Sequence, residues 1–140
     1  MTEMITSRTN QKLKNVKKLL NSARERKASG LFVVEGMRIC SEVPPELLDC
    51  VYISSDFRGD ASGRSNAEIV APDIFRDISD TVNPQGILAV VRQPELKPEN
   101  IAGRKGKILL LDGIRDPGNL GTIIRTAEAA GVAAVYMSPD

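Results

Sequence analysis

The 140-residue chain contains no histidine and no tryptophan, and only two cysteines, Cys40 and Cys50. Two isolated thiols without a CxxC spacing cannot supply the ligands of a tetrahedral zinc site, so no metal site is expected. Both cysteines lie in apolar stretches, which favours buried, reduced thiols. Aromatic residues make up only 4% of the chain. We therefore expect an aliphatic core and no broad platform for stacking bases.

Long apolar runs are also missing. No stretch reaches the ~20 consecutive apolar residues that a membrane-spanning helix needs. The amino terminus has no basic segment followed by an apolar core, so no secretory signal is expected. These absences favour a cytoplasmic protein with no membrane partner. Apolar residues still make up 41% of the sequence, enough for a packed core.

Charge is distributed unevenly, although the net charge is only +1. Residues 1–30 contain eight lysines and arginines and two glutamates, a net charge of +6, whereas the rest of the chain carries −5. A basic segment on an acidic body is typical of a protein that contacts a polyanion at one end. The charge pattern alone is equally compatible with a solvated helix face.

Apolar spacing predicts a helix in this basic segment, with one apolar face and lysines on the opposite face. Ser7 or Asn10 is a candidate cap for its start, and Gly30 a candidate end of the helical region. The apolar positions are Leu13, Val16, Leu19, Leu20 and Ala23.

From residue 31 to residue 91, strands and short helices alternate, which predicts an α/β layer. A short helix is expected around Ile39, Cys40 and Val43, ended by Pro44–Pro45, and another over residues 72–79. A loop is expected over residues 56–66, which are rich in Gly, Ser and Asp. The expected strands are 31–35, read as buried, 50–54, 69–71 and 87–91.

Residues 93–106 hold two prolines, two glycines and mixed charge, a composition typical of a linker. We therefore predict a domain over residues 1–95, a linker over 96–106 and the beginning of a second domain over 107–140.

The segment after the linker predicts a strand–loop–helix–strand unit. Residues 107–112 form a continuous apolar run, typical of a strand covered on both faces. A loop over 113–118 leads to a helix from about Asn119 to Ala130, which Gly131 can end, and a strand over 133–137 follows. One such unit cannot bury both faces of two apolar strands, so the rest of this domain is expected beyond residue 140. The expected packing side of the helix is Ile123, Ile124, Ala127 and Ala130.

The turn between this strand and helix is a candidate site. Backbone N–H groups at a helix start, with the positive end of the helix dipole, suit a phosphate or a carboxylate. Ligands of parallel sheets bind at the carboxyl ends of the strands, where this turn lies. The glycine spacing matches neither a dinucleotide fingerprint nor a P-loop. A tight turn without a ligand is the alternative.

Arg125 favours a functional site. It lies on the helix away from the packing side, about one and a half turns beyond Asn119, so both residues are candidates for contacting one substrate phosphate or sugar. A guanidinium binds phosphate through a planar fork of donors. Pairing of Arg125 with Glu128 is the alternative.

Residues 112–131 resemble the first signature motif of the SpoU-type (TrmH-like, SPOUT) RNA methyltransferases. The matching positions are Asn119, Gly121, Arg125, Thr126, Ala127 and Gly131. The amino-terminal part is similar to the substrate-binding domain of that family. Its matching positions are Ile5–Ser7, Asn10, Lys12, Arg24, Arg26, 32–36 and 83–91.

The resemblance implies a small amino-terminal α/β sandwich, like the ribosomal proteins that bind RNA kink-turns, followed by the first βαβ unit of a truncated knotted domain that forms homodimers. It implies transfer of a methyl group from S-adenosylmethionine to a ribose 2′-hydroxyl of RNA, ribosomal RNA above all. Arg125 and Asn119 are the implied catalytic residues, and the donor-binding residues are expected beyond Asp140. The chain alone is therefore expected to be inactive. The implied RNA contacts are Arg8, Asn10, Lys12, Lys14, Lys17, Lys18, Arg24 and Arg26.

A stand-alone RNA-binding module is the alternative function. Such a module has no use for a half-built parallel sheet that carries Asn119 and Arg125. A generic small-ligand α/β protein is disfavoured by the basic helix and by the lack of a known phosphate-loop spacing.

Overall fold

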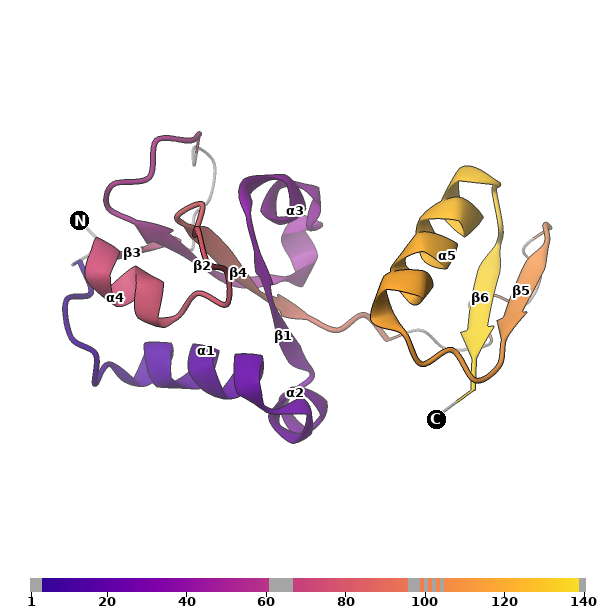
Figure 1. Ribbon diagram of the computed structural model, residues 1–140, viewed down its shortest axis with the longest axis horizontal. Coiled ribbons are helices and arrows are strands. Elements are labelled where there is room, and N and C mark those ends of the chain that lie inside the picture. The colour runs from indigo at the N-terminus through magenta and orange to yellow at the C-terminus, as the bar shows by residue number, and fades with distance from the viewer. Residues whose placement is uncertain are drawn as a thin grey trace. The chain divides into compact units, whose positions relative to one another are not determined.

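The computed structural model divides into two compact units, residues 1–94 and residues 95–140 (Figure 1). The structure describes residues 4–60, 67–95, 99, 101, 103 and 105–138. The predicted linker 96–106 and the predicted loop 56–66 thus lie partly outside the described residues.

The first unit is built on a four-stranded sheet in the order β1-β4-β2-β3. The central strand β4 runs antiparallel to both β1 and β2, and β2 runs parallel to β3. Ile5 extends the sheet beyond β3, because it forms a parallel bridge to Val70. The strands are β1 Leu31–Glu35, β2 Leu48–Ser54, β3 Ala67–Val70 and β4 Ile87–Arg92.

Helices cover both faces of this sheet. On one face α1 (Gln11–Asn21) and α4 (Pro72–Asp77) enclose a core cluster with Leu88 of β4. On the other face α3 (Met37–Glu42) encloses a second cluster with Ile87. Adjacent residues of a strand point to opposite faces, so β4 contributes to both clusters. The predicted α/β class is confirmed. The remaining helical segments are α2 (Ala23–Ser29) and the 3₁₀ turn Pro45–Leu47.

The predicted amino-terminal helix is two helices, which meet at Ser22. Ser22 has an extended backbone, and its hydroxyl accepts a hydrogen bond from the Glu25 N–H at 3.2 Å. Ser-x-x-Glu is the pattern of a capping box, so α2 starts where one helix was expected to continue. Ala23, predicted on the apolar face, is exposed. Gly30 ends the helical region as predicted, with a positive φ of 66°.

Strand β1 was predicted to be buried, but each of its residues is half-buried. The reason is its position at the edge of the sheet, where only β4 pairs with it. Strand order depends on contacts distant in the sequence, and the local apolar run at 31–35 does not encode it.

The second unit has the predicted strand–loop–helix–strand order. Its elements are β5 (Ile108–Leu111), α5 (Pro117–Ala129) and β6 (Ala134–Met137), and the strands pair in parallel. The predicted packing side of the helix was too wide, because only Ala127 is buried, Ile123 is half-buried, and Ile124 and Ala130 are exposed.

The two strands of the second unit were predicted to be covered on both faces, and the described residues of this unit cover only one. On the uncovered face the exposed fractions of Ile108, Leu110 and Tyr136 are 57%, 76% and 39%. None of the helices that the structure describes is both long and apolar enough to span a bilayer.

Candidate functional site

The exposed side of α1 carries part of the basic segment. Asn10 caps this helix, because its Oδ1 accepts a hydrogen bond from the Lys12 N–H at 2.8 Å, so one of the two predicted caps is confirmed. Lys14 and Lys18 are exposed and lie four residues apart, which places them on one helix face. Lys17 is half-buried beside them.

Two predicted RNA contacts form ion pairs with acidic residues of the same unit. The Lys12 ammonium contacts the Glu68 carboxylate, and this hydrogen bond raises the pKa of Lys12. Arg8 Nε lies 2.9 Å from Asp77 Oδ2. RNA phosphates would therefore compete with these carboxylates for Arg8 and Lys12.

Arg26 has a structural role that the sequence did not suggest. Its Nη1 donates hydrogen bonds to the carbonyl oxygens of Leu19, at 2.7 Å, and Leu20, at 3.1 Å. These carbonyls belong to the last turn of α1, where the helix supplies no further N–H donors for its C=O groups. Arg26 therefore fastens α2 to the end of α1. Arg24 is exposed and forms no ion pair with a described residue.

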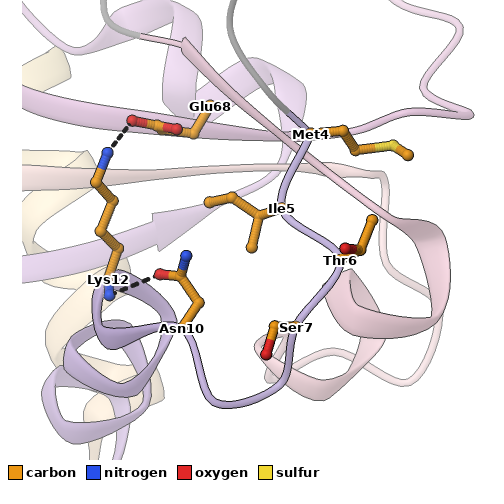
Figure 2. Close-up of a pocket in the computed structure, with 7 residues that line it drawn as sticks. All are labelled: Met4, Ile5, Thr6, Ser7, Asn10, Lys12 and Glu68. Carbon is orange, nitrogen blue, oxygen red and sulfur yellow. Dashed lines mark hydrogen bonds and ion pairs between the residues drawn. The ribbon is translucent and has the colours of Figure 1, made fainter.

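A groove of about 510 Å³ lies where the chain enters α1 (Figure 2). Its residues come from three parts of the first unit: the segment that pairs with β3, the start of α1, and β3 itself. Glu68 was not among the predicted site residues, because nothing in its local sequence marks it, and its partner Lys12 is 56 positions away. The lining residues are Met4, Ile5, Thr6, Ser7, Asn10, Lys12 and Glu68.

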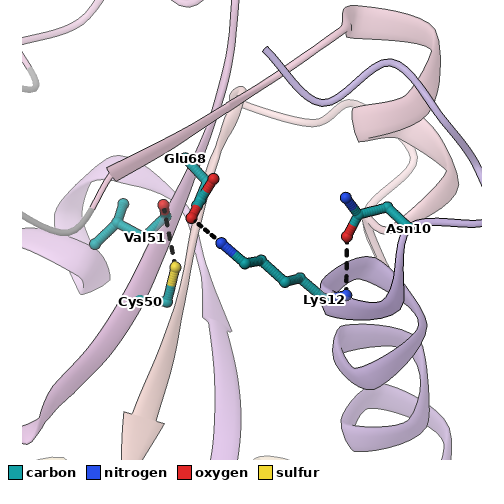
Figure 3. A network of polar contacts seen from close by, with 5 residues as sticks. All are labelled: Asn10, Lys12, Cys50, Val51 and Glu68. Atoms are coloured by element: carbon teal, nitrogen blue, oxygen red, sulfur yellow. Dashed lines mark hydrogen bonds and ion pairs between the residues drawn. The ribbon is translucent and has the colours of Figure 1, made fainter. Parts of the chain in front are cut away.

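Cys50 lies close to the Lys12–Glu68 pair (Figure 3). Burial raises the pKa of its thiol, which lowers the fraction of reactive thiolate. Cys40 is buried, and neither cysteine forms a disulfide. The prediction of burial is confirmed for Cys40, whereas Cys50 is only half-buried.

The candidate turn of the second unit starts a helix two residues earlier than predicted. Asp116 is the cap, its Oδ1 accepting a hydrogen bond from the Asn119 N–H at 2.6 Å, and Pro117 occupies the first turn. Asp followed by Pro is a helix-start signal. It was missed because the glycines around it suggested a loop that continues to residue 118. Gly118 leaves room for this cap, since an added Cβ would lie 3.2 Å from Asp116 Oδ1.

The cap changes the chemistry expected of this turn. The sequence predicted unsatisfied N–H groups that would attract an anion, and for Asn119 this is wrong, because the Asp116 carboxylate already accepts its N–H. A carboxylate at the helix start also satisfies the positive end of the dipole. A phosphate would have to approach against that charge.

Arg125 is exposed, and its side chain extends back toward the helix start. Its Nη2 lies 3.4 Å from Thr122 Oγ1, and its Nη1 lies 3.7 Å from the place of an added Cβ at Gly121. The separation of 3.7 Å is an ordinary van der Waals distance, so an alanine at 121 would also leave room for the guanidinium. No ion pair joins Arg125 to Glu128, and no hydrogen bond joins it to the exposed Asn119, in the part of the chain that is described.

Two family models match the chain. Residues 10–89 match the MRM3-like substrate binding domain, and residues 106–140 match the SpoU rRNA Methylase family. The first match alone covers more than half of the chain.

Proteins of similar sequence carry the names of ribosomal RNA methyltransferases. The chain is 36% identical over 139 residues to 23S rRNA (guanosine(2553)-2′-O)-methyltransferase RlmP of Bacillus subtilis (strain 168), which covers 96% of this chain and 54% of that relative. It is 30% identical over 141 residues to human rRNA methyltransferase 3, mitochondrial, with coverage of 91% and 33%. The chain thus spans about half the length of the first of these relatives and a third of the second.

Solved structures extend the likeness to the fold. The AdoMet-bound rRNA methyltransferase from Sinorhizobium meliloti superimposes with a TM-score of 0.81 at 26% identity, over 99% of this chain and 55% of that one. The SpoU methyltransferase AviRb from Streptomyces viridochromogenes, solved with AdoMet, gives 0.72 at 25% identity, over 91% and 52%.

The mixed α/β fold is that of the SPOUT RNA methyltransferases. Within this class, the chain belongs to the SpoU/TrmH-type family of rRNA 2′-O-methyltransferases, with an MRM3-like substrate-binding domain in front of its SpoU segment. The resemblance in the sequence is thereby confirmed.

Proposed function

We propose that a protein of the relatives' length containing this chain transfers a methyl group from S-adenosylmethionine to a ribose 2′-hydroxyl of ribosomal RNA. The main support is the SpoU segment, in which Arg125 lies exposed on the helix that follows β5. The Bacillus subtilis relative is named for 2′-O-methylation of 23S rRNA, and the human relative for methylation of rRNA.

Arg125 is proposed to stabilise the negative charge that develops on the 2′-oxygen as its proton leaves. A guanidinium stays protonated in proteins, so charge stabilisation and positioning suit it better than proton abstraction. Asn119, one and a half turns earlier, is proposed to contact the same nucleotide.

The donor requires partners for a carboxylate, an ammonium group, ribose hydroxyls and an adenine. The cavity beside α5 in the second unit, about 290 Å³, is lined by aliphatic side chains and by the two threonines Thr122 and Thr126. Those residues do not fit the donor, and no donor-binding residue is assigned here. We propose that the donor is held by residues beyond Asp140, within a knotted domain that dimerises, and that the 140 residues alone are inactive.

The first unit is proposed to hold structured RNA, as the kink-turn-binding ribosomal proteins do. Lys14, Lys17, Lys18 and Arg24 suit phosphate contacts, because no described acidic residue pairs with them. Arg8, Asn10, Lys12 and Arg26 are proposed as contacts that also hold the domain together. The protein is proposed to act in the cytoplasm, and domain limits of 1–95 and 107–140 remain our assignment.

The function is tested by incubating labelled S-adenosylmethionine and ribosomal RNA with this chain and with a protein of the relatives' length. A methylated 2′-hydroxyl cannot assist strand cleavage, so products appear as alkali-resistant dinucleotides. Labelling by the longer protein only is the expected result. If neither protein labels RNA yet both bind it, the alternative of an RNA-binding module replaces this proposal.

Replacing Lys14 and Lys18 together with glutamine is expected to weaken RNA binding at all sequences. Each lost phosphate contact lowers the slope of log affinity against log salt by about 0.7–0.9, so the pair should lower it by about 1.4–1.8. Binding titrations at several salt concentrations measure the slope.

The matched control replaces Arg38 and Arg58, both exposed and outside the basic segment, with glutamine. It changes the net charge by the same amount. If the control lowered the slope as much as the lysine pair does, the assignment of the α1 face would be wrong.

A further inference from the structure

We infer that the groove at the start of α1 binds one unstacked nucleotide of the RNA by its base, with Glu68 as hydrogen-bond acceptor and Asn10 as donor. The inference rests on the proposed function, because it assigns one part of the RNA to one place on the first unit. The volume of the groove, about 510 Å³, lies within the range of ~300–1,000 Å³ that is typical of small-molecule sites.

The donor is fixed by the fold of α1. Asn10 must use its Oδ1 to cap the helix, since this oxygen accepts the Lys12 N–H. The amide nitrogen is therefore the group left for a ligand, and Figure 2 shows it directed into the groove toward Ile5. A side-chain amide with a fixed orientation offers N–H donors in a defined direction.

The acceptor is the carboxylate of Glu68. One of its oxygens, Oε1, is paired with Lys12. Its other oxygen forms no hydrogen bond with any residue that the structure describes, and the Glu68 side chain is 19% exposed. A carboxylate accepts hydrogen bonds from N–H groups on base edges, whereas it repels a phosphate.

The walls suit a flat, partly apolar ligand. Ile5 is 8% exposed, and Met4, 45% exposed, is a polarisable side chain at the rim. This wall is anchored, because the Ile5 N–H donates to Ile69 O at 2.8 Å and Ile5 O accepts the Ala71 N–H at 3.0 Å. Sequence-specific proteins recognise RNA mainly through such unstacked bases.

The direction in which one substitution changes the affinity for RNA separates base binding from phosphate binding. If the groove held a phosphate, Glu68→Gln would remove a repulsive charge, release Lys12 and strengthen binding. If it holds a base, the same change replaces the free carboxylate oxygen with an amide NH₂ group, because the one acceptor oxygen of glutamine stays paired with Lys12. We expect affinity for a labelled single-stranded RNA of about 12 nucleotides to fall about tenfold, with an unchanged salt slope.

A base-free ribose-phosphate chain of the same length is the second probe. The unaltered 140-residue chain should bind it about tenfold more weakly than the RNA, and Glu68→Gln should not weaken that binding further. Asn10→Ser keeps a helix cap but removes the amide donor at no change in charge, and should also weaken binding of the RNA. Thermal melting verifies that each variant is folded.

Asp77→Asn is the matched control, because it removes the acidic partner of Arg8 outside the groove. Asp77→Asn should bind the RNA more tightly, because it frees Arg8. If Glu68→Gln also bound the RNA more tightly than the unaltered chain does, the inference would be overturned. Equal affinity of the unaltered chain for the two probes, or no binding of the RNA at all, would overturn it too. Methyl transfer by the longer protein is a separate readout, so the proposed function can stand when this inference fails.

Discussion

Replacing Arg125 with alanine in a protein of the relatives' length is expected to lower the rate of methyl transfer to RNA by about 10²–10³-fold. This is the usual loss when one group that stabilises a developing oxyanion is removed. The guanidinium is exposed and held loosely by Thr122, 3.4 Å away, so it is available to a substrate. The initial rate with saturating RNA and donor measures the effect.

The fall in rate should not come from lost folding or lost RNA affinity. Arg125 contributes no buried contact, so melting temperature and RNA affinity should stay near those of the unaltered protein. Glu128→Gln, on the same helix and also exposed, is the matched control and should keep its rate. An Arg125→Ala protein with weaker RNA binding but an unchanged maximal rate would make Arg125 a phosphate contact instead.

Arg125→Lys separates charge from geometry. Lysine keeps the positive charge but loses the planar fork of donors. Partial recovery of the rate would indicate that charge near the 2′-oxygen matters most. A rate as low as that of alanine would indicate that the directed N–H groups are needed.

Local signals predicted most elements of the fold correctly. Asn10 and Gly30 bound the first helical region as expected, because capping and positive φ depend on single residues. The break at Ser22 was missed, although Ser22 and Glu25 have the spacing of a capping box, because apolar spacing continues across it. Asp116 was missed for a similar reason, since the glycines of the turn suggested a later helix start.

Contacts between distant segments could not be predicted. Glu35 lies in a strand predicted from its apolar run, but its carboxylate accepts hydrogen bonds from Ser79 and Thr81, which are far away in the sequence. Gln85 likewise accepts the Met37 N–H at 2.8 Å, beside Gly36 with its φ of 107°. These residues fasten the segment before β4 to the end of β1, and no local pattern connects them.

In the candidate site too, local sequence patterns predicted single residues but not the contacts between distant segments. Arg125 was predicted because its motif is contiguous in the sequence, whereas the pairing of Lys12 with Glu68 joins positions that no spacing rule relates. A basic residue predicted as an RNA contact can therefore have an acidic partner in the folded protein. Lys14 and Lys18 are better candidates than Lys12, because their helix face points away from the sheet.

Replacing Leu88 with alanine is expected to lower the free energy of unfolding of the first unit by about 2–5 kcal/mol. Leu88 is fully buried in the central strand β4, and it packs in the cluster that holds α1. The loss combines removed apolar contacts with the cavity left behind. Urea unfolding followed by circular dichroism measures it, and Val82→Ala, 96% exposed, should change stability by less than about 0.5 kcal/mol.

A substitution of the adjacent Ile87 tests whether the effect of Leu88→Ala is confined to the core cluster on one face of the sheet. Ile87 is equally buried but belongs to the cluster under α3, so Ile87→Ala should cost a similar free energy. Hydrogen exchange should then separate the two variants. Leu88→Ala should speed exchange of α1 amides more than those of α3, and Ile87→Ala should do the reverse.

Because α1 carries the proposed phosphate contacts, Leu88→Ala should also weaken RNA binding at temperatures where Ile87→Ala does not. Equal exchange in both helices for both variants would mean that the two clusters open together, and the RNA-binding face would then depend on the whole sheet.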